Sequence, residues 1–178
     1  PSDTLLFCVV YEALDSGCCI IAVCRESGKI VGSCFYHPRT THVALGIMNV
    51  HSAFFGKGIA GSLLSWITNY AEQKKLPVRL VSSAQNLDSF SLYTKKGFVP
   101  FLSFQDLFIE VPANGLNLRS IPEDETIREA KPEDIADMVE LELELSEIER
   151  PKDFSYFIKN AEGIWKTLIF RDREEKLL

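Results

Sequence analysis

Three glycines between two apolar runs constrain this chain more than any other feature. Gly56, Gly58 and Gly61 follow the apolar run 43–50, which predicts a buried strand, and they precede residues with the apolar spacing of a helix. Glycines let the backbone turn tightly and approach a ligand without interference from a Cβ atom. The first amides of the helix then point outward together at the positive end of its dipole, where a pyrophosphate suits them. Residues 44–70 therefore predict a strand–loop–helix unit that can hold a phosphate-bearing ligand.

Three other interpretations compete with this one. The loop also fits the G-x-G-x-x-G dinucleotide pattern, which needs a carboxylate about twenty residues on to hold a ribose. The next strand ends Val81-Ser82-Ser83-Ala84-Gln85 and supplies none. A Walker A loop needs Ser or Thr after its lysine, whereas Lys57 precedes Gly58. Both nucleotide-binding patterns are therefore excluded, and a tight strand-to-helix turn that holds no ligand stays open.

The rest of the chain predicts alternating helices and strands, as in an α/β fold. Residues 2–14 are strongly apolar and run into a turn, so we expect the end of a helix there, with a strand as the alternative. Strands are predicted at 19–24, 30–36, 43–50, 78–81, 127–130 and 165–170, with one or two more within 99–111. Helices are predicted from Gly61 to Leu76 and at 88–96, 132–145 and 154–160.

Charge is spread unevenly along the chain. The net charge is −6. Residues 1–118 contain nine Lys and Arg against eight Asp and Glu, a charge of +1, and residues 119–178 contain ten against seventeen, a charge of −7. An acidic second part argues against nucleic acid as the main partner. We therefore expect the first part to be a separate electrostatic unit.

The cysteines and the lengths of the apolar runs indicate the cellular compartment in which we expect the protein. All five cysteines lie in the first fifth of the chain, their number is odd, and their spacing forms no pair of CxxC motifs. We therefore expect buried thiols in a reducing cytoplasm, without a zinc site or disulfides. No apolar run approaches the length that crosses a bilayer, so no membrane partner is expected.

The loop resembles the coenzyme A loop of the GNAT family of N-acetyltransferases. In that family a strand ending in Val leads to Arg or Gln, two residues, Gly, one residue, and then Gly or Ala. Val50 and the run Gly56-Lys57-Gly58-Ile59-Ala60 match, while Phe55 stands where Arg or Gln is usual. The resemblance implies that acetyl-CoA (coenzyme A) is bound by the backbone and side chains of Val50, Phe55, Gly56, Lys57, Gly58, Ile59, Ala60 and Gly61.

A second block supports the resemblance. The run Asn86-Leu87-Asp88-Ser89-Phe90-Ser91-Leu92-Tyr93-Thr94-Lys95-Lys96-Gly97-Phe98 is similar to the family's Asn-rich turn followed by Leu-Tyr-x-Lys-x-Gly-Phe. In relatives the Asn contacts the cofactor arm, and the Tyr hydroxyl protonates the departing thiolate. The resemblance thus implies that Asn86 binds cofactor and that Tyr93 binds cofactor and acts as general acid. The alternatives are a helix cap for Asn86 and a half-buried core tyrosine for Tyr93.

The family resemblance implies direct attack of a neutral amine on the acyl thioester. The backbone around Val50 and His51 would polarise the carbonyl. Many relatives carry a basic carboxylate on the strand before the loop, but residues 43–49 contain none. His42 and His51 flank this strand and could accept a proton, and we take His51 as the candidate catalytic base. Surface histidines without a catalytic role, or a water chain, are the alternatives, and His37 beside Pro38 is expected in a loop.

The resemblance implies a fold and two candidate functions. The fold is a GNAT-like mixed, mostly antiparallel sheet flanked by helices, with a partial second α/β unit. The first function is an acyltransferase that moves an acetyl group from coenzyme A to an amine of an unknown small-molecule or peptide acceptor. The second is a non-catalytic coenzyme A-binding or structural module of a tandem GNAT protein, which Phe55 and the missing carboxylate favour.

The order of elements predicts two units joined by a linker. Residues 1–112 form the acyl-CoA-binding GNAT-like domain without its opening elements, 113–126 form a linker, and 127–178 start a second GNAT-like repeat without a cofactor site. Residues 167–178 echo residues 20–31, each being an apolar strand, a charged turn and the opening of another strand. We expect the two pieces to pack together, or to pair in a homodimer, or to belong to a longer protein.

Overall fold

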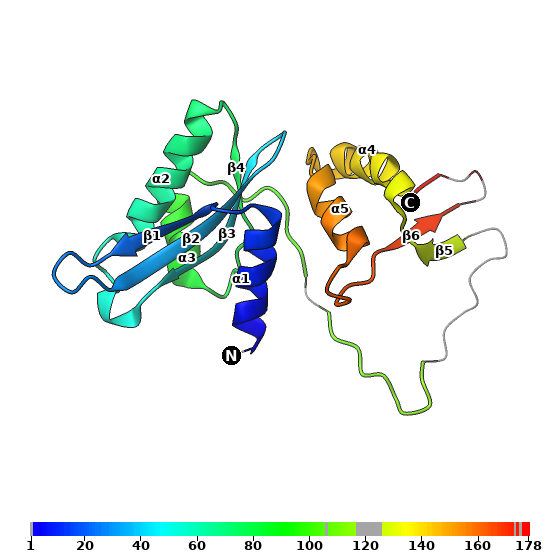
Figure 1. Ribbon diagram of the computed structural model, residues 1–178, viewed down its shortest axis with the longest axis horizontal. Coiled ribbons are helices and arrows are strands. Elements are labelled where there is room, and N and C mark those ends of the chain that lie inside the picture. The colour runs from blue at the N-terminus through cyan, green and yellow to red at the C-terminus, as the bar shows by residue number, and fades with distance from the viewer. Residues whose placement is uncertain (1, 106, 117–125, 173, 175) are drawn as a thin grey trace.

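The computed structural model describes residues 2–105, 107–116, 126–172, 174 and 176–178 (Figure 1). A four-stranded sheet occupies the first unit, in the order β1-β2-β3-β4. Its strands are β1 (Cys19–Val23), β2 (Ile30–Pro38), β3 (Val43–Val50) and β4 (Val78–Arg79). The first three pair antiparallel, and β4 pairs parallel with the start of β3. The sheet is thus mixed and mostly antiparallel, as the family resemblance implies.

Helices cover both faces of this sheet. One face is covered by α1 (Ser2–Leu14), whose Tyr11 ring packs edge-on against the rings of Phe35 and His37. Side chains alternate along a strand, so Cys34 and Tyr36 point to the opposite face. There they form the core with residues of α2 (Ile59–Gln73), namely Leu63, Ile67 and Ala71. The helix expected at the N-terminus is confirmed, and the strand alternative is wrong.

Two short elements complete the first unit. A 3-10 turn, η1 (Ser52–Phe54), links β3 to the glycine loop, and α3 (Leu87–Lys95) follows β4. Gly32 on β2 lies so close under the start of α2 that a Cβ atom there would be 2.9 Å from Ile59 Cγ2. This close approach fixes the height of the first turn of α2 above the sheet.

The second unit has the order strand, helix, helix, strand. Its elements are β5 (Thr126–Glu129), η2 (Pro132–Asp134), α4 (Ile135–Ser146), α5 (Pro151–Lys159) and β6 (Leu168–Arg171). The strands β5 and β6 pair antiparallel. Buried Asp134 joins them to the helices, because its carboxylate accepts hydrogen bonds from Arg128, Arg171 and the Lys131 amide. The division into domains, and the second unit as a repeat of the first, stay predictions.

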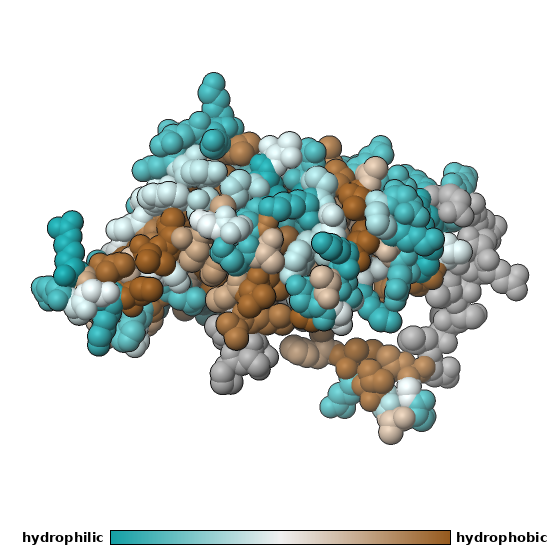
Figure 2. All heavy atoms as spheres, in the orientation of Figure 1, coloured by the Kyte–Doolittle hydropathy of each residue, from teal (hydrophilic) through white to brown (hydrophobic). Residues whose placement is uncertain are grey.

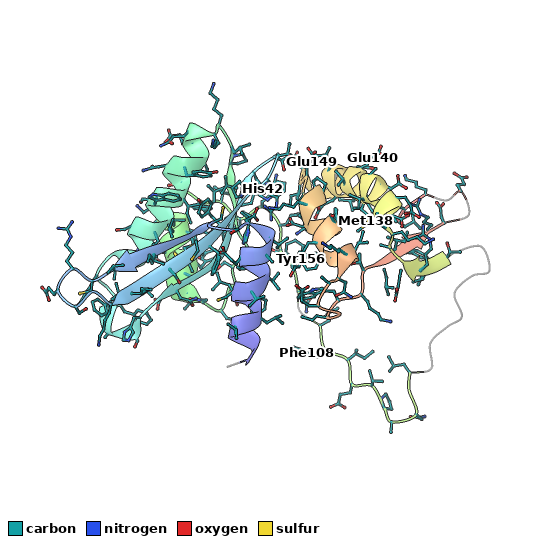
Figure 3. The ribbon with its side chains drawn as sticks, viewed as in Figure 1. His42, Phe108, Met138, Glu140, Glu149 and Tyr156 are labelled. Atoms are coloured by element: carbon teal, nitrogen blue, oxygen red, sulfur yellow. The ribbon has the colours of Figure 1, made fainter. Side chains whose placement is uncertain are left out.

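The two units touch through polar contacts. Helices α1 and α5 lie side by side (Figure 1). Arg39, after β2, donates from Nε and Nη2 to the two carboxylate oxygens of Asp153 on α5, at 2.8 and 2.6 Å. The Glu149 amide donates to Thr41 Oγ1, and Figure 3 shows Glu149 near His42 at this boundary. Breaking a buried charged pair costs free energy, so these contacts fix the position of one unit against the other.

Several predicted strands differ from the structure. Residues 99–105 and 107–111 form no strand, and their apolar side chains are exposed, Phe108 to 98% (Figures 2 and 3). The strand predicted at 78–81 is also shorter than expected, because β4 ends at Arg79. A strand needs a neighbouring strand to pair with, and β4 has only two paired residues. The last strand begins at Leu168 rather than at residue 165.

No helix within the described ranges has the length and apolar character that a membrane crossing demands.

Candidate functional site

The glycine loop has the backbone shape that the sequence predicts for it. Gly56 and Gly58 have φ angles of 73° and 77°, in the left-handed region that favours glycine, and Gly58 is the N-cap of α2. The first backbone hydrogen bond of the helix runs from the Ser62 amide to the Gly58 carbonyl, at 3.0 Å. The amides of residues 59–61 precede it, so the helix itself gives them no acceptor. Free amides at the positive end of a helix dipole are groups that can bind an anion.

The end of β3 offers a second set of backbone donors. The His51 amide donates to the Val31 carbonyl at 2.9 Å, so residues 31 and 51 form a hydrogen-bonded pair. In an antiparallel ladder such pairs alternate, and the N–H groups of Val50 and Met48 therefore point away from β2. Within the described residues β4 pairs only with Val43 and Ala44, so the far edge of β3 is open beyond them. The Val50 amide, which is expected to donate to the carbonyl oxygen of a thioester, therefore points to the open edge of β3. The His51 amide already donates to the Val31 carbonyl.

Helix α3 brings Tyr93 to the same part of the molecule. A Cβ atom on Gly61 would lie 4.0 Å from Leu92 Cδ1, and Lys96 Nζ donates to Ser65 Oγ at 3.0 Å, so α3 packs along the start of α2. Tyr93 is 9% exposed, and its ring lies 5.9 Å from that of Phe98. Burial raises the pKa of Tyr93, with a smaller contribution from Cys34. Its hydroxyl therefore holds its proton at neutral pH.

The side chains around the loop are less specialised than its backbone. Phe55 is 67% exposed, and Lys57 Nζ lies 4.7 Å above the Phe54 ring. Asn86 caps α3, because its Oδ1 accepts from the Ser89 amide at 3.1 Å. The cap that was the alternative for Asn86 is thus present, and its cofactor contact stays a prediction. The free amides, the open strand edge and one nearby ammonium group fit a ligand with a phosphate end and an extended arm.

The histidines differ from expectation. His51 is exposed, and its Nδ1 accepts from the Ala53 amide at 3.2 Å, so its role as base stays a prediction. His42 is buried rather than on the surface, and burial, followed by the charges of Arg79, Arg39 and Arg150, lowers its pKa to about 4. At that pKa His42 is a weak base.

His37, expected in a loop, lies in β2. It is 5% exposed, and its Nδ1 is 2.7 Å from Asp15 Oδ2. Sequence reasoning missed this pair because the two residues are 22 positions apart and belong to no shared motif. The alternation of β2 is the available signal, because it puts His37 on the same face as Phe35 and therefore under α1.

Comparison with known protein families decides the nature of this first unit. Residues 15–100 match the family model of the acetyltransferase (GNAT) domain. The chain carries a GNAT acetyltransferase domain. The match includes β1–β4, the glycine loop, α2 and α3. Members of the GNAT family use acetyl-CoA.

Solved structures similar to the chain include several acetyltransferases. An aminoglycoside N-acetyltransferase, AAC(6')-Iy, in complex with CoA is 17% identical, with a TM-score of 0.42 over 53% of this chain and 75% of that one. A Trypanosoma brucei acetyltransferase is 19% identical, with a TM-score of 0.44 over 57% and 77%. Glucosamine-6-phosphate N-acetyltransferase from Arabidopsis thaliana is 19% identical, with a TM-score of 0.41 over 52% and 66%. No curated protein sequence matches the chain.

Proposed function

We propose that the GNAT domain of this chain binds acetyl-CoA at the loop from Gly56 to Gly61 and transfers the acetyl group to an amine. One observation carries the proposal. The anion-binding start of α2, the open edge of β3 and the helix that bears Tyr93 meet in one part of the domain. An acyl-CoA transferase needs donors for a pyrophosphate, donors for a carbonyl oxygen and an acid for a thiolate.

Each group of the chain has a defined task in this proposal. The amides of residues 59–61 hold the phosphates, and the Val50 amide at the open edge donates to the carbonyl oxygen. When bound, acetyl-CoA supplies a thioester whose C–S bond breaks as the C–N bond to the amine forms. The Tyr93 hydroxyl gives its proton to the thiolate. Its raised pKa means that the hydroxyl is protonated at neutral pH before this step. The acceptor is a neutral amine of a small molecule or a peptide.

A second candidate function has its own support. Phe55 replaces the family's Arg or Gln, and β3 carries no carboxylate, so the domain could bind coenzyme A without catalysis. The two candidates differ in turnover but not in binding.

One experiment separates the two candidates. The protein is incubated with acetyl-CoA and a panel of polyamines, amino sugars and peptides, and the release of free coenzyme A thiol is followed. We expect release that depends on the amine, with an acetylated amine as the second product. Binding of acetyl-CoA by calorimetry without amine-dependent release would reject the transferase and support the binding module.

A further inference from the structure

A buried histidine–aspartate pair lies on the α1 face of the sheet. His37 is 5% exposed and Asp15, just after α1, is 8% exposed. The distance from His37 Nδ1 to Asp15 Oδ2 is 2.7 Å. A carboxylate only accepts, so Nδ1 carries the hydrogen in the neutral imidazole and Nε2 carries the free lone pair.

The free nitrogen of His37 points at β3. His37 Nε2 is buried and has no hydrogen-bond partner among the residues that the structure describes. A Cβ atom on Gly46 would lie only 3.1 Å from it, so the ring occupies space that any other residue at position 46 would fill. An unpaired buried nitrogen costs about 1–3 kcal/mol, which indicates a role that compensates for the cost.

Gly46 lies where the sheet opens. The register between β2 and β3 shifts between Cys34 and Tyr36, which leaves an extra residue on β3 between Leu45 and Met48. On one side of this bulge Ala44 pairs with β4, and on the other side Met48 and Val50 turn their amides to the open edge. His37 Nε2 thus reaches the strand at the boundary between its closed and open parts.

The acid and this histidine approach β3 from opposite faces. Tyr93 lies near Cys34, whose side chain belongs to the core under α2. His37 lies under α1, with the Tyr11 ring 4.6 Å away. The amine nitrogen and the departing sulfur are different groups on the reacting carbon, so a base for the first and an acid for the second can approach from different sides.

We infer that His37 is the general base of this transferase and that Asp15 is its positioning residue. The inference deepens the proposed function and rests on it. As the C–N bond forms, the proton of the amine nitrogen passes to His37 Nε2, while the Tyr93 proton passes to the thiolate. Solvent then returns a proton to Tyr93 and removes one from His37, so the protein ends as it began.

The surroundings of His37 favour the neutral imidazole, chiefly through burial. Burial lowers the pKa of His37 most, and Arg39 lowers it further, whereas the hydrogen bond and the charge of Asp15 raise it and Asp153 raises it slightly. Lys152 on α5 donates to the other oxygen of Asp15 at 2.9 Å and Arg39 Nη1 donates to Oδ2 at 2.8 Å. Tyr11 is a further titratable group against the ring, within the part of the chain that the structure describes. A neutral imidazole at pH 7 is the form that can accept a proton.

The first test needs no acetyl-CoA. Nitrogen chemical shifts of the imidazoles are followed by NMR as a function of pH in the wild-type protein and in Asp15→Asn. We expect His37 to carry its hydrogen on Nδ1 in the wild type, and its pKa to fall in the variant because a stabilising negative charge is lost. A His37 with its hydrogen on Nε2, or a pKa that Asp15→Asn leaves unchanged, would overturn the inference.

The second test measures kcat/KM against pH with an accepted amine. In the wild type the rate falls at acid pH as His37 takes up a proton. His37→Gln should lower kcat/KM by about 100-fold, the size of a general-base contribution, and should remove this limb. Asp15→Asn should move the limb to lower pH. Asp153→Asn is the comparison variant, because Asp153 does not touch His37 and raises its pKa less than Asp15 does, so the limb should move to lower pH by less than in Asp15→Asn.

The outcomes separate this inference from the proposed function. Acetyl-CoA affinity and thermal unfolding are measured for every variant. If His37→Gln does not fold, the shift of the acid limb of kcat/KM in Asp15→Asn decides whether His37 is the base. A wild-type protein that turns over amines, with the same pH profile in His37→Gln, overturns the role of His37 alone. A wild-type protein that binds acetyl-CoA without turnover overturns both.

Discussion

Gly61 on α2 faces Leu92 on α3, and a methyl group on Gly61 would lie at van der Waals distance, 4.0 Å, from Leu92 Cδ1. This contact joins two sequence blocks that are separated by β4 and its loops. It places the residue after Leu92, Tyr93, beside the helix whose N-terminus is the proposed anion site. The acid and the cofactor loop of the proposed site are therefore positioned by one helix–helix contact.

Replacing Tyr93 by Phe should lower kcat about 100-fold and leave the dissociation constant of acetyl-CoA almost unchanged, because only the departing thiolate needs the hydroxyl. Tyr70→Phe is the matched control, since Tyr70 near the end of α2 packs against the rings of Tyr36 and Trp66, whereas the loop lies at the start of α2. Steady-state thiol release and calorimetry measure the two quantities. Equal kcat in wild type and Tyr93→Phe would leave Tyr93 as a packing residue.

Replacing Phe55 by Arg should tighten acetyl-CoA binding about tenfold, because a charge-assisted hydrogen bond to a phosphate is added. The exposed position of Phe55 means that the change disturbs little packing. The gain should shrink at high salt. Phe7→Arg on α1 adds the same charge at another exposed phenylalanine and should not tighten binding. An unchanged affinity in Phe55→Arg would place the phosphates away from this turn.

Replacing Asp153 by Ala should destabilise the protein by about 3 kcal/mol, because it leaves the buried Arg39 without its two-pronged partner. The free energy of unfolding in urea gives the measurement. Lys166→Ala breaks an exposed pair with Glu129 and should cost less than about 1 kcal/mol. Equal small losses in both variants would mean that the two units do not depend on this contact.

Stability should depend on pH through His42. The pKa of His42 is about 4 in the folded protein, below the ordinary value of 6.5. Between these two pH values His42 is therefore protonated in the unfolded chain and neutral in the folded protein. Stability should therefore fall as the pH falls from 6.5 to 4, and His42→Asn should reduce that slope. Urea midpoints at several pH values measure it, and identical slopes in the two proteins would contradict the buried position of His42.

The sequence predicted the elements whose pattern is local. The strand 43–50 agrees with β3 residue for residue, because a continuous apolar run ends there at a glycine-rich turn. The helix after the loop follows from the spacing of Leu63, Leu64 and Ile67, all buried in the structure. The positive φ angles of Gly56 and Gly58 also follow from the residue type.

Features that depend on distant partners could not be predicted in this way. The bond between Asp15 and His37 needs α1 to end above β2, which no local pattern states. The apolar alternation of 99–111 predicts strands, yet a strand forms only where a sheet edge is available to pair with it. A surface position is the alternative that the sequence leaves open for His42, but His42 is buried beside the contact between the two units (Figure 3).

Calorimetric titration of two glycine variants tests most directly whether the glycine loop holds acetyl-CoA. Gly58→Val and Gly163→Val each place a branched side chain at a positive φ angle, 77° and 66°, with no atom within 4 Å of the new Cβ, so they carry similar strain of about 1–2 kcal/mol. Gly163 lies between α5 and β6 in the second unit, away from the loop (Figure 1). We predict that Gly58→Val abolishes acetyl-CoA binding and that Gly163→Val keeps wild-type affinity. Wild-type affinity in a folded Gly58→Val protein would contradict acetyl-CoA binding by the loop.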